Sequence, residues 1–396
     1  MFNGKYLIFL LTLIIPEINA FHRIICSQYY PFQTRTTRIK NDTNFYHSRA
    51  LSVAWIHRGG AGNVDSTQSL SHPLPMSFST MSYAARIVNK YITQSLQSGN
   101  AGCIFTQWAI AFSVVFPLTM LRKGYSFSIG YGYSVMAMAW ILMYTYQISS
   151  VTYISNPSTF FSHYPSVHLA FATFLYGLRL GTFLLVRIWT VPSKARQMNE
   201  FDENTNKGRA TVQRFSFQDW LQRFFLSMTV SLFYACMVAP LLFVLHNSTT
   251  KKPNVVQFHT MIPQVGAIIA WLGLFIETVA DAQKFIIKWK HGSYLDRTNK
   301  TFVGPTQGLY SVCRHPNYLG EVLFWAGLFI GGLTSYGAHI MKWISSILGL
   351  TGILFIMFNA TKRLDQKQGD LYTGQDKYDS WKKKVPYPLF PGIQRA

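Results

Sequence analysis

The sequence predicts an all-α membrane protein, a polytopic bundle of about seven transmembrane helices. Hydrophobic residues make up 49% of the 396 residues and charged residues only 13%, a balance typical of membrane proteins. The chain also contains seven apolar stretches, each long enough or nearly long enough to cross the hydrocarbon core of a bilayer as a helix. These stretches cover approximately residues 103–121, 127–150, 166–190, 224–246, 260–283, 321–337 and 341–359.

The loops between these stretches differ in charge, which predicts how the helices are ordered across the membrane. Basic residues follow the first, third, fifth and seventh stretches, whereas residues 153–166 after the second contain no Lys or Arg. With seven spans all the basic loops lie on one side, and the positive-inside rule places that side in the cytosol or stroma. Arg86, Lys90, Lys251 and Lys252 are exceptions to this pattern. The sixth and seventh stretches are short and adjacent, which is compatible with a tight helical hairpin.

Charge and cysteine content exclude several classes of function. The formal net charge is +21, but no basic domain separates from the apolar stretches, so we expect no nucleic-acid partner. The four cysteines show neither paired nor metal-type spacing, so we expect no disulfide framework and no metal site. No GxGxxG follows a strand, which argues against a Rossmann domain.

The N-terminal region has the composition of a targeting segment. Residues 1–20 combine Lys5, an apolar run and a plausible cleavage site ending at Ala20, as in a signal peptide. Residues 21–72 are rich in Arg, Ser, Thr and His and poor in acids, as in a transit peptide. Together they resemble the bipartite presequence of algae with secondary plastids, which favours a plastid membrane for the integral-membrane domain, residues 73–396. The alternative is an endoplasmic reticulum signal followed by a lumenal segment.

A polar motif between the fifth and sixth stretches is the first candidate site. Five polar side chains fall within eight positions, because Arg314 and His315 are followed closely by Asn317, Tyr318 and Glu321. Pro316 disfavours a helical conformation at His315, so we expect a turn and then a helix that begins near Leu319. An exposed helix N-terminus beside Arg and His suits an anion. The alternative is a membrane-interface loop capped by Asn317.

The eight residues from Arg314 to Glu321, Arg-His-Pro-Asn-Tyr-Leu-Gly-Glu, resemble the signature of the steroid 5-alpha-reductase C-terminal-domain family. That family and the related sterol C14- and C7-reductases are membrane proteins that use NADPH to reduce a polarised carbon–carbon double bond. The resemblance implies a cofactor region at residues 260–396. It also implies that Arg314 and His315 face cofactor phosphates or ribose, that Asn317 bonds a carboxamide, that Tyr318 stacks on or bonds the cofactor, and that Glu321 anchors the loop.

A second candidate lies on the fifth stretch, where Glu277, Asp281, Lys284 and Lys288 share one helical face. Ionisable groups inside an apolar segment are costly and usually functional. From spacing alone, a salt-bridge stripe at the helix end is an equally open interpretation. The resemblance implies that Glu277, Asp281 and Lys288 contact the cofactor, although the family often has Asn and Arg at the first and last of these positions.

The third candidate is Tyr176-x-x-Arg179, in the middle of the third stretch. The two side chains share a face, and an Arg at this depth needs a partner or a polar cavity. The resemblance implies that Tyr176 polarises a substrate carbonyl and donates a proton, with Arg179 contacting the substrate. The Gln-Glu-x-Pro segment that supplies a carboxylate in steroid reductases is not evident here. The alternative is a structural Tyr beside an Arg that snorkels or pairs with a helix end.

The tail completes the resemblance, since Lys377-Tyr-x-x-Trp381 and Val385-Pro-Tyr are similar to the family's C-terminus. Arg363 falls where relatives present a basic or His residue to the cofactor. We therefore expect a membrane oxidoreductase that uses NADPH to reduce a conjugated double bond of a lipid-soluble steroid, isoprenoid or fatty-chain substrate. The first alternative is an S-adenosylmethionine-dependent methyltransferase similar to the isoprenylcysteine carboxyl methyltransferases, which carry a looser Arg-His-Pro-x-Tyr-x-Gly. The second is a non-catalytic membrane protein with this fold.

Overall fold

A computed structural model describes residues 78–99, 102–148, 165–191, 194, 198–199, 217–250, 258–290 and 301–391. The regular structure in these ranges is helical throughout, which confirms the predicted all-α class. The predicted signal peptide and transit-peptide-like segment, residues 1–72, lie outside the described residues.

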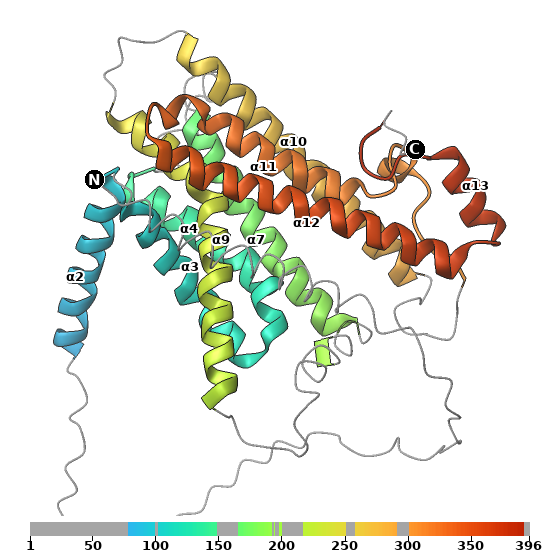
Figure 1. Cartoon of the computed structure of the whole chain (residues 1–396), viewed down its shortest axis with the longest axis horizontal. Coiled ribbons are helices and arrows are strands. Elements are labelled where there is room, and N and C mark those ends of the chain that lie inside the picture. Colours follow the sequence, from blue (N-terminus) through green and yellow to red (C-terminus); the bar gives the residue numbers. More distant parts are fainter. Residues whose placement is uncertain are drawn as a thin grey trace, which may run out of the picture.

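Each of the seven predicted spans corresponds to one helix of the bundle (Figure 1). Six of these helices are long and apolar enough to cross a membrane, so the chain is an integral membrane protein. The remaining one, α4, has 17 residues and is about 26 Å long, slightly short of a full span. The seven helices are α3 (Gly102–Leu121), α4 (Ile129–Thr145), α7 (Pro165–Thr190), α9 (Phe217–Thr250), α10 (Phe258–Lys290), α11 (Pro316–Tyr336) and α12 (Ile340–Tyr372).

The last two spans are longer than the apolar pattern predicted. Helix α12 has 33 residues and is about 50 Å long, well beyond the roughly 30 Å hydrocarbon core. Its additional turns after residue 359 are polar, so hydropathy gave no sign of them, and they carry Asp365 and Lys367 beyond the apolar segment. Figure 1 shows α10, α11 and α12 running side by side, with the short C-terminal helix α13 (Asp376–Lys384) next to the far end of α12.

An additional helix, α2 (Phe78–Gln97), precedes the bundle and was not predicted. Its C-terminal end is attached by hydrogen bonds from Gln97 Nε2 to the Thr145 carbonyl (3.2 Å) and from Tyr146 Oη to the Leu96 carbonyl (3.0 Å). Polar residues are interspersed among its apolar ones, so the hydropathy of this segment is too low to predict a membrane span. The same amphipathic pattern allows one face of α2 to pack on α3 and α4.

Glycines allow two helix pairs to approach until their backbones touch. On the α10–α11 pair, a Cβ at Gly320 would lie 2.5 Å from the Glu277 nitrogen and 2.7 Å from the Gly273 carbonyl oxygen. On the α4–α7 pair, a Cβ at Gly132 would lie 2.3 Å from the Gly181 nitrogen. Small residues at membrane helix interfaces permit such close packing. As a result, side chains adjacent to these glycines are held against the opposite helix.

Candidate active site

The polar motif forms the start of α11, but three residues earlier than predicted. Pro316 itself is the first helical residue, and His315 is the N-cap with φ −130° and ψ 63°. Proline suits this position because its fixed φ is already helical and its missing N–H would have no intrahelical partner. Asn317, Tyr318 and Glu321 therefore all lie in the first two turns of α11.

Arg314 is held by a fork of hydrogen bonds to α12. Its Nε donates to Asp365 Oδ1 at 3.0 Å and its Nη2 to Asp365 Oδ2 at 2.5 Å, while Nη1 donates to the Val385 carbonyl at 2.9 Å. The guanidinium is buried, and a buried cation requires such partners. Arg314 thus joins the motif, α12 and the C-terminal segment.

His315 belongs to the same group of contacts. We call this group the clasp; it comprises the side chains of Arg314, His315 and Asp365 and the carbonyls of Val385 and Pro388. Its Nε2 lies 3.0 Å from Asp365 Oδ1, and its backbone N–H donates to the Pro388 carbonyl at 3.0 Å. Burial lowers the pKa of the imidazole; the nearby Lys284 and Arg314 lower it further, whereas the bond to Asp365 opposes the shift. The expectation of an exposed helix N-terminus flanked by Arg314 and His315 was wrong, because Asp365 and the tail cover both side chains. A contact of either residue with a cofactor stays a prediction.

Several buried polar atoms around the motif have no hydrogen-bond partner. They include Asn317 Oδ1 on the first turn of α11, Gln283 Oε1 on α10 and Gln368 Oε1 on α12. Gln283 reaches the loop before the motif, since a Cβ at Gly308 would lie 2.2 Å from its Nε2. Buried polar groups are normally satisfied, so each of these acceptors on the three helices is available to a donor from a water or a ligand.

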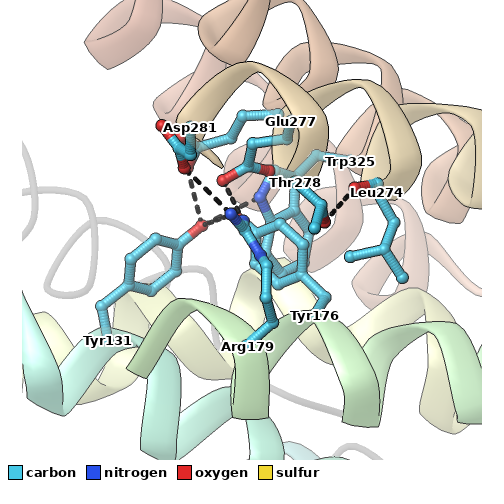
Figure 2. A network of polar contacts seen from close by, with 9 residues as sticks. Tyr131, Tyr176, Arg179, Leu274, Glu277, Thr278, Asp281 and Trp325 are labelled. Carbon is cyan, nitrogen blue, oxygen red and sulfur yellow. Dashed lines mark hydrogen bonds and ion pairs between the residues drawn. The ribbon is translucent and has the colours of Figure 1, made fainter. Parts of the chain in front are cut away.

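Deeper in the bundle, Arg179 of α7 pairs with two carboxylates of α10 (Figure 2). Its Nη1 donates to Asp281 Oδ2 at 2.9 Å, and its Nη2 contacts Glu277 Oε1. The prediction that Arg179 needs a partner is confirmed. The alternative of a salt-bridge stripe stays open, since Glu277 and Asp281 do form salt bridges, and their partner is Arg179 of α7. One oxygen of this group, Glu277 Oε2, remains buried without a partner.

Tyr176 lies one turn from Arg179 and is the end of a second buried network. Its Oη is 3.0 Å from the Oη of Tyr131 on α4. Tyr131 Oη donates to Glu321 Oε1 at 3.0 Å and accepts a hydrogen bond from Trp325 Nε1 at 2.9 Å. A phenol has one proton, so the donation to Glu321 leaves Tyr176 as the donor to Tyr131. The Tyr176 ring stacks on Phe324 with centroids 4.0 Å apart.

Tyr131 and Trp325 were not predicted as site residues, and Glu321 has a different partner from the one expected. Glu321 accepts a hydrogen bond from Tyr131 of α4 inside the bundle instead of bonding the motif loop. Through Tyr131, the hydroxyl of Tyr176 is linked to the carboxylate of Glu321 on α11. The Gly130-Tyr131-Gly132 run inside a span was the available signal, since paired glycines mark a close helix contact.

A cluster of cations gathers at the basic end of the bundle. It consists of Arg187 on α7, Lys194 after the end of α7, Lys284 and Lys288 on α10, and Lys367 on α12. The charges of these five side chains act on one another. Burial and then the other four cations lower the pKa of the Lys194 ammonium well below its ordinary value. Asp281 acts on Lys284 but already pairs with Arg179. This cation cluster brings together positive charge from three helices.

Two further predicted residues, Arg363 and Tyr318, contact their neighbours in the chain. Arg363 Nε donates to the Asn359 carbonyl at 3.0 Å on its own helix. The ring of Tyr318 stacks on His315 with centroids 5.8 Å apart. Their contacts with a cofactor stay predictions. Within the described ranges, no group of three or more His, Cys, Asp or Glu side chains could hold a metal ion.

The family model described as "Protein of unknown function (DUF1295)" matches residues 131–385. The match begins at Tyr131 and ends at Val385, so it includes both buried networks, the cation cluster and the clasp except for Pro388. No curated protein and no solved structure matches the chain.

Proposed function

We propose that this chain, a member of the DUF1295 family, is an NADPH-dependent membrane reductase. The description of the family names no activity, so the proposal rests on the site. Its substrate is a lipid-soluble molecule, sterol-like, isoprenoid or fatty-chain, with a carbon–carbon double bond conjugated to a carbonyl. The six apolar helices support a substrate that reaches the site from the bilayer. The membrane is that of a plastid, with the endoplasmic reticulum as the alternative.

The cation cluster is the observation that carries the proposal. Five basic side chains concentrated in one partly buried place repel one another, and a bound anion relieves that repulsion. The phosphates of NADPH supply that charge, and Arg187 Nε, buried without a partner, is a donor available to them. S-adenosylmethionine carries a sulfonium cation and one carboxylate, so its charge fits this cluster poorly. Lys288 keeps the cofactor contact that was predicted for it, here with a phosphate.

The orphaned acceptors fit the nicotinamide end of the same cofactor. Asn317 Oδ1 lacks a donor, and a carboxamide N–H₂ is such a donor. Glu277 Oε2 is a second unpaired acceptor, on the helix that faces α11 across the glycine contact. We assign Asn317 and Glu277 to the carboxamide and ribose part, with Asp281 and Arg179 holding Glu277 in place. Bound NADPH supplies the hydride.

Tyr176 is the proton donor in this mechanism. Hydride addition to the end of the conjugated double bond builds negative charge on the carbonyl oxygen, and a hydroxyl aimed at that oxygen stabilises it. Tyr176 is fully buried, so water does not compete for the oxygen. The Arg179 guanidinium lies 5.7 Å from the centre of the Tyr176 ring, where its charge stabilises the phenolate that proton donation leaves.

Ligand-dependent thermal stability of the purified full-length chain tests the cofactor. We expect NADPH to stabilise the protein by about 2.7 kcal/mol at a hundredfold excess over its Kd, and NADH to do so much less. Asn317→Ala and the double change of Lys284 and Lys288 to Gln should weaken the NADPH effect. Lys383→Gln, which removes an exposed charge from α13, should not.

Stabilisation by S-adenosylmethionine with no response to NADPH would refute the proposal in favour of methyl transfer. A folded protein that responds to neither cofactor would favour the non-catalytic alternative. Equal NADPH responses in Asn317→Ala and the unchanged chain would place the cofactor elsewhere.

A further inference from the structure

We propose that Tyr131 is a positioning residue for Tyr176: it holds the Tyr176 hydroxyl at the reacting oxygen and links it to Glu321. The inference rests on the function proposed above and assigns a role to a residue that lies outside the reductase-like motifs. It follows from three hydrogen bonds that meet at one oxygen atom.

The Tyr131 hydroxyl has every bond it can make. Trp325 Nε1 donates to it at 2.9 Å, Tyr176 Oη lies at 3.0 Å, and its own proton goes to Glu321 Oε1 at 3.0 Å. Trp325 can only donate, and the single Tyr131 proton is donated to Glu321, so these two partners fix the direction of the third bond. The Tyr176 proton therefore points at Tyr131.

Packing holds the Tyr131 ring as firmly as the hydrogen bonds hold its oxygen. The ring stacks on Tyr234 with centroids 5.0 Å apart and on Trp325 with centroids 6.4 Å apart. Its neighbour Gly132 touches the α7 backbone at Gly181, one helical turn and a residue from Tyr176. The Tyr131 ring is therefore held between α9 and α11, and α4 itself is held against α7.

This arrangement allows Tyr176 to release its bond to Tyr131 while the Tyr131 oxygen still accepts a hydrogen bond. When a substrate oxygen accepts the Tyr176 proton, the Tyr131 oxygen keeps the donor from Trp325. When Tyr176 carries negative charge after donation, the Tyr131 hydroxyl is 3.0 Å away and can turn its proton from Glu321 to the phenolate. Only hydrogen bonds are exchanged at Tyr131, so it acts through Tyr176 and not on the substrate.

A fluorescent lipid-like phenol, 6-heptyl-2-naphthol, tests the inference without knowledge of the natural substrate. Its ionised form mimics an enolate, and its two protonation states emit at different wavelengths. The full-length protein, saturated with NADP⁺, is titrated with the probe at several pH values to give a Kd and the pKa of the bound naphthol. The same titration is performed on Tyr131→Phe, Glu321→Gln and the control Tyr234→Phe.

We expect Tyr131→Phe to raise the pKa of the bound naphthol by about one unit, which corresponds to about 1.4 kcal/mol, and Glu321→Gln to shift it as well. Tyr234→Phe removes a hydroxyl from the ring stacked on Tyr131, but that hydroxyl bonds the Ser126 carbonyl and not the network. Tyr234→Phe should therefore leave the pKa of the bound naphthol unchanged. If Tyr131 had a purely structural role, both variants would shift that pKa equally.

Three results would overturn the inference: an unchanged naphthol pKa in Tyr131→Phe, an equal shift in Tyr234→Phe, or no binding of the probe to the unchanged protein. If Tyr131→Phe does not fold, an unchanged pKa in Glu321→Gln overturns it. Stabilisation by NADPH is measured on the same preparations, so loss of the inference with intact NADPH binding leaves the proposed function standing. Absence of NADPH binding removes both.

Discussion

Removal of the Arg179 guanidinium is the change whose consequence the structure determines most directly. Arg179 lies between Glu277 and Asp281, and the three side chains are 17%, 3% and 14% exposed. Arg179→Met preserves much of the side-chain volume and leaves two carboxylates of α10 without their cation. Breaking a buried pair by removing one partner costs about 3–5 kcal/mol. The adjacent carboxylates also repel each other, so we expect the upper half of that range.

The physical cause of this loss can be separated from the lost packing by a second variant. In Arg179→Met combined with Glu277→Gln and Asp281→Asn, no charge remains to be desolvated. Replacement of a whole buried ionic group by neutral residues is often nearly neutral for stability. We therefore expect the triple variant to recover most of the stability that the single variant loses, while NADPH-dependent stabilisation stays impaired because Glu277 is changed.

Unfolding of the full-length protein in mixed detergent, followed by far-ultraviolet circular dichroism, gives the comparison. Lys90→Met, a change at an exposed basic residue on α2, is the control for loss of one positive charge. A cost of less than about 1 kcal/mol for Arg179→Met, a value usual for exposed ion pairs, would refute the reasoning. So would a triple variant that is no more stable than the single one.

Three further outcomes follow from the packing and the clasp. Gly320→Ala places a methyl group 2.7 Å from the Gly273 carbonyl oxygen and should destabilise the protein by about 1–3 kcal/mol. The control Gly102→Ala, whose new methyl group would have no atom within 4 Å, should cost little. Equal losses of thermal stability in the two variants would contradict the close packing of α10 on α11. Arg314→Lys cannot reproduce the fork to Asp365, so the C-terminal segment should become more accessible to proteolysis; unchanged cleavage would show that the fork is dispensable. The pKa of His315 is lower in the folded state than its ordinary value of 6.5, so the unfolded state binds more protons and stability should fall as pH drops below about 6.5. His315→Gln should weaken this pH dependence of stability. Identical pH profiles of the two proteins would refute His315 as its source.

The apolar pattern alone determined the class and the spans of this protein. Each predicted stretch corresponds to a helix because a segment in hydrocarbon must satisfy its own backbone, and helix formation does that locally. The pattern failed where the helices leave the membrane: the polar turns at the end of α12 carry Asp365, and hydropathy cannot distinguish an extended polar helix from a loop. The start of α11 was misplaced because Pro316 permits a helix to begin at itself.

The polar partners were decided by tertiary structure. From the sequence, Arg179 required a partner, but its two carboxylates are 98 and 102 residues away. The Tyr131 hydroxyl meets Glu321 across 190 residues, and the glycines beside Tyr131 indicate a close helix contact but not which side chain its hydroxyl meets. Glycine contacts between α4 and α7 and between α10 and α11 set which faces meet, and with them which side chains share a buried hydrogen bond. Burial of single polar groups can be expected from sequence, whereas their pairing depends on helix packing, because a buried charge accepts any partner that the packing brings within reach.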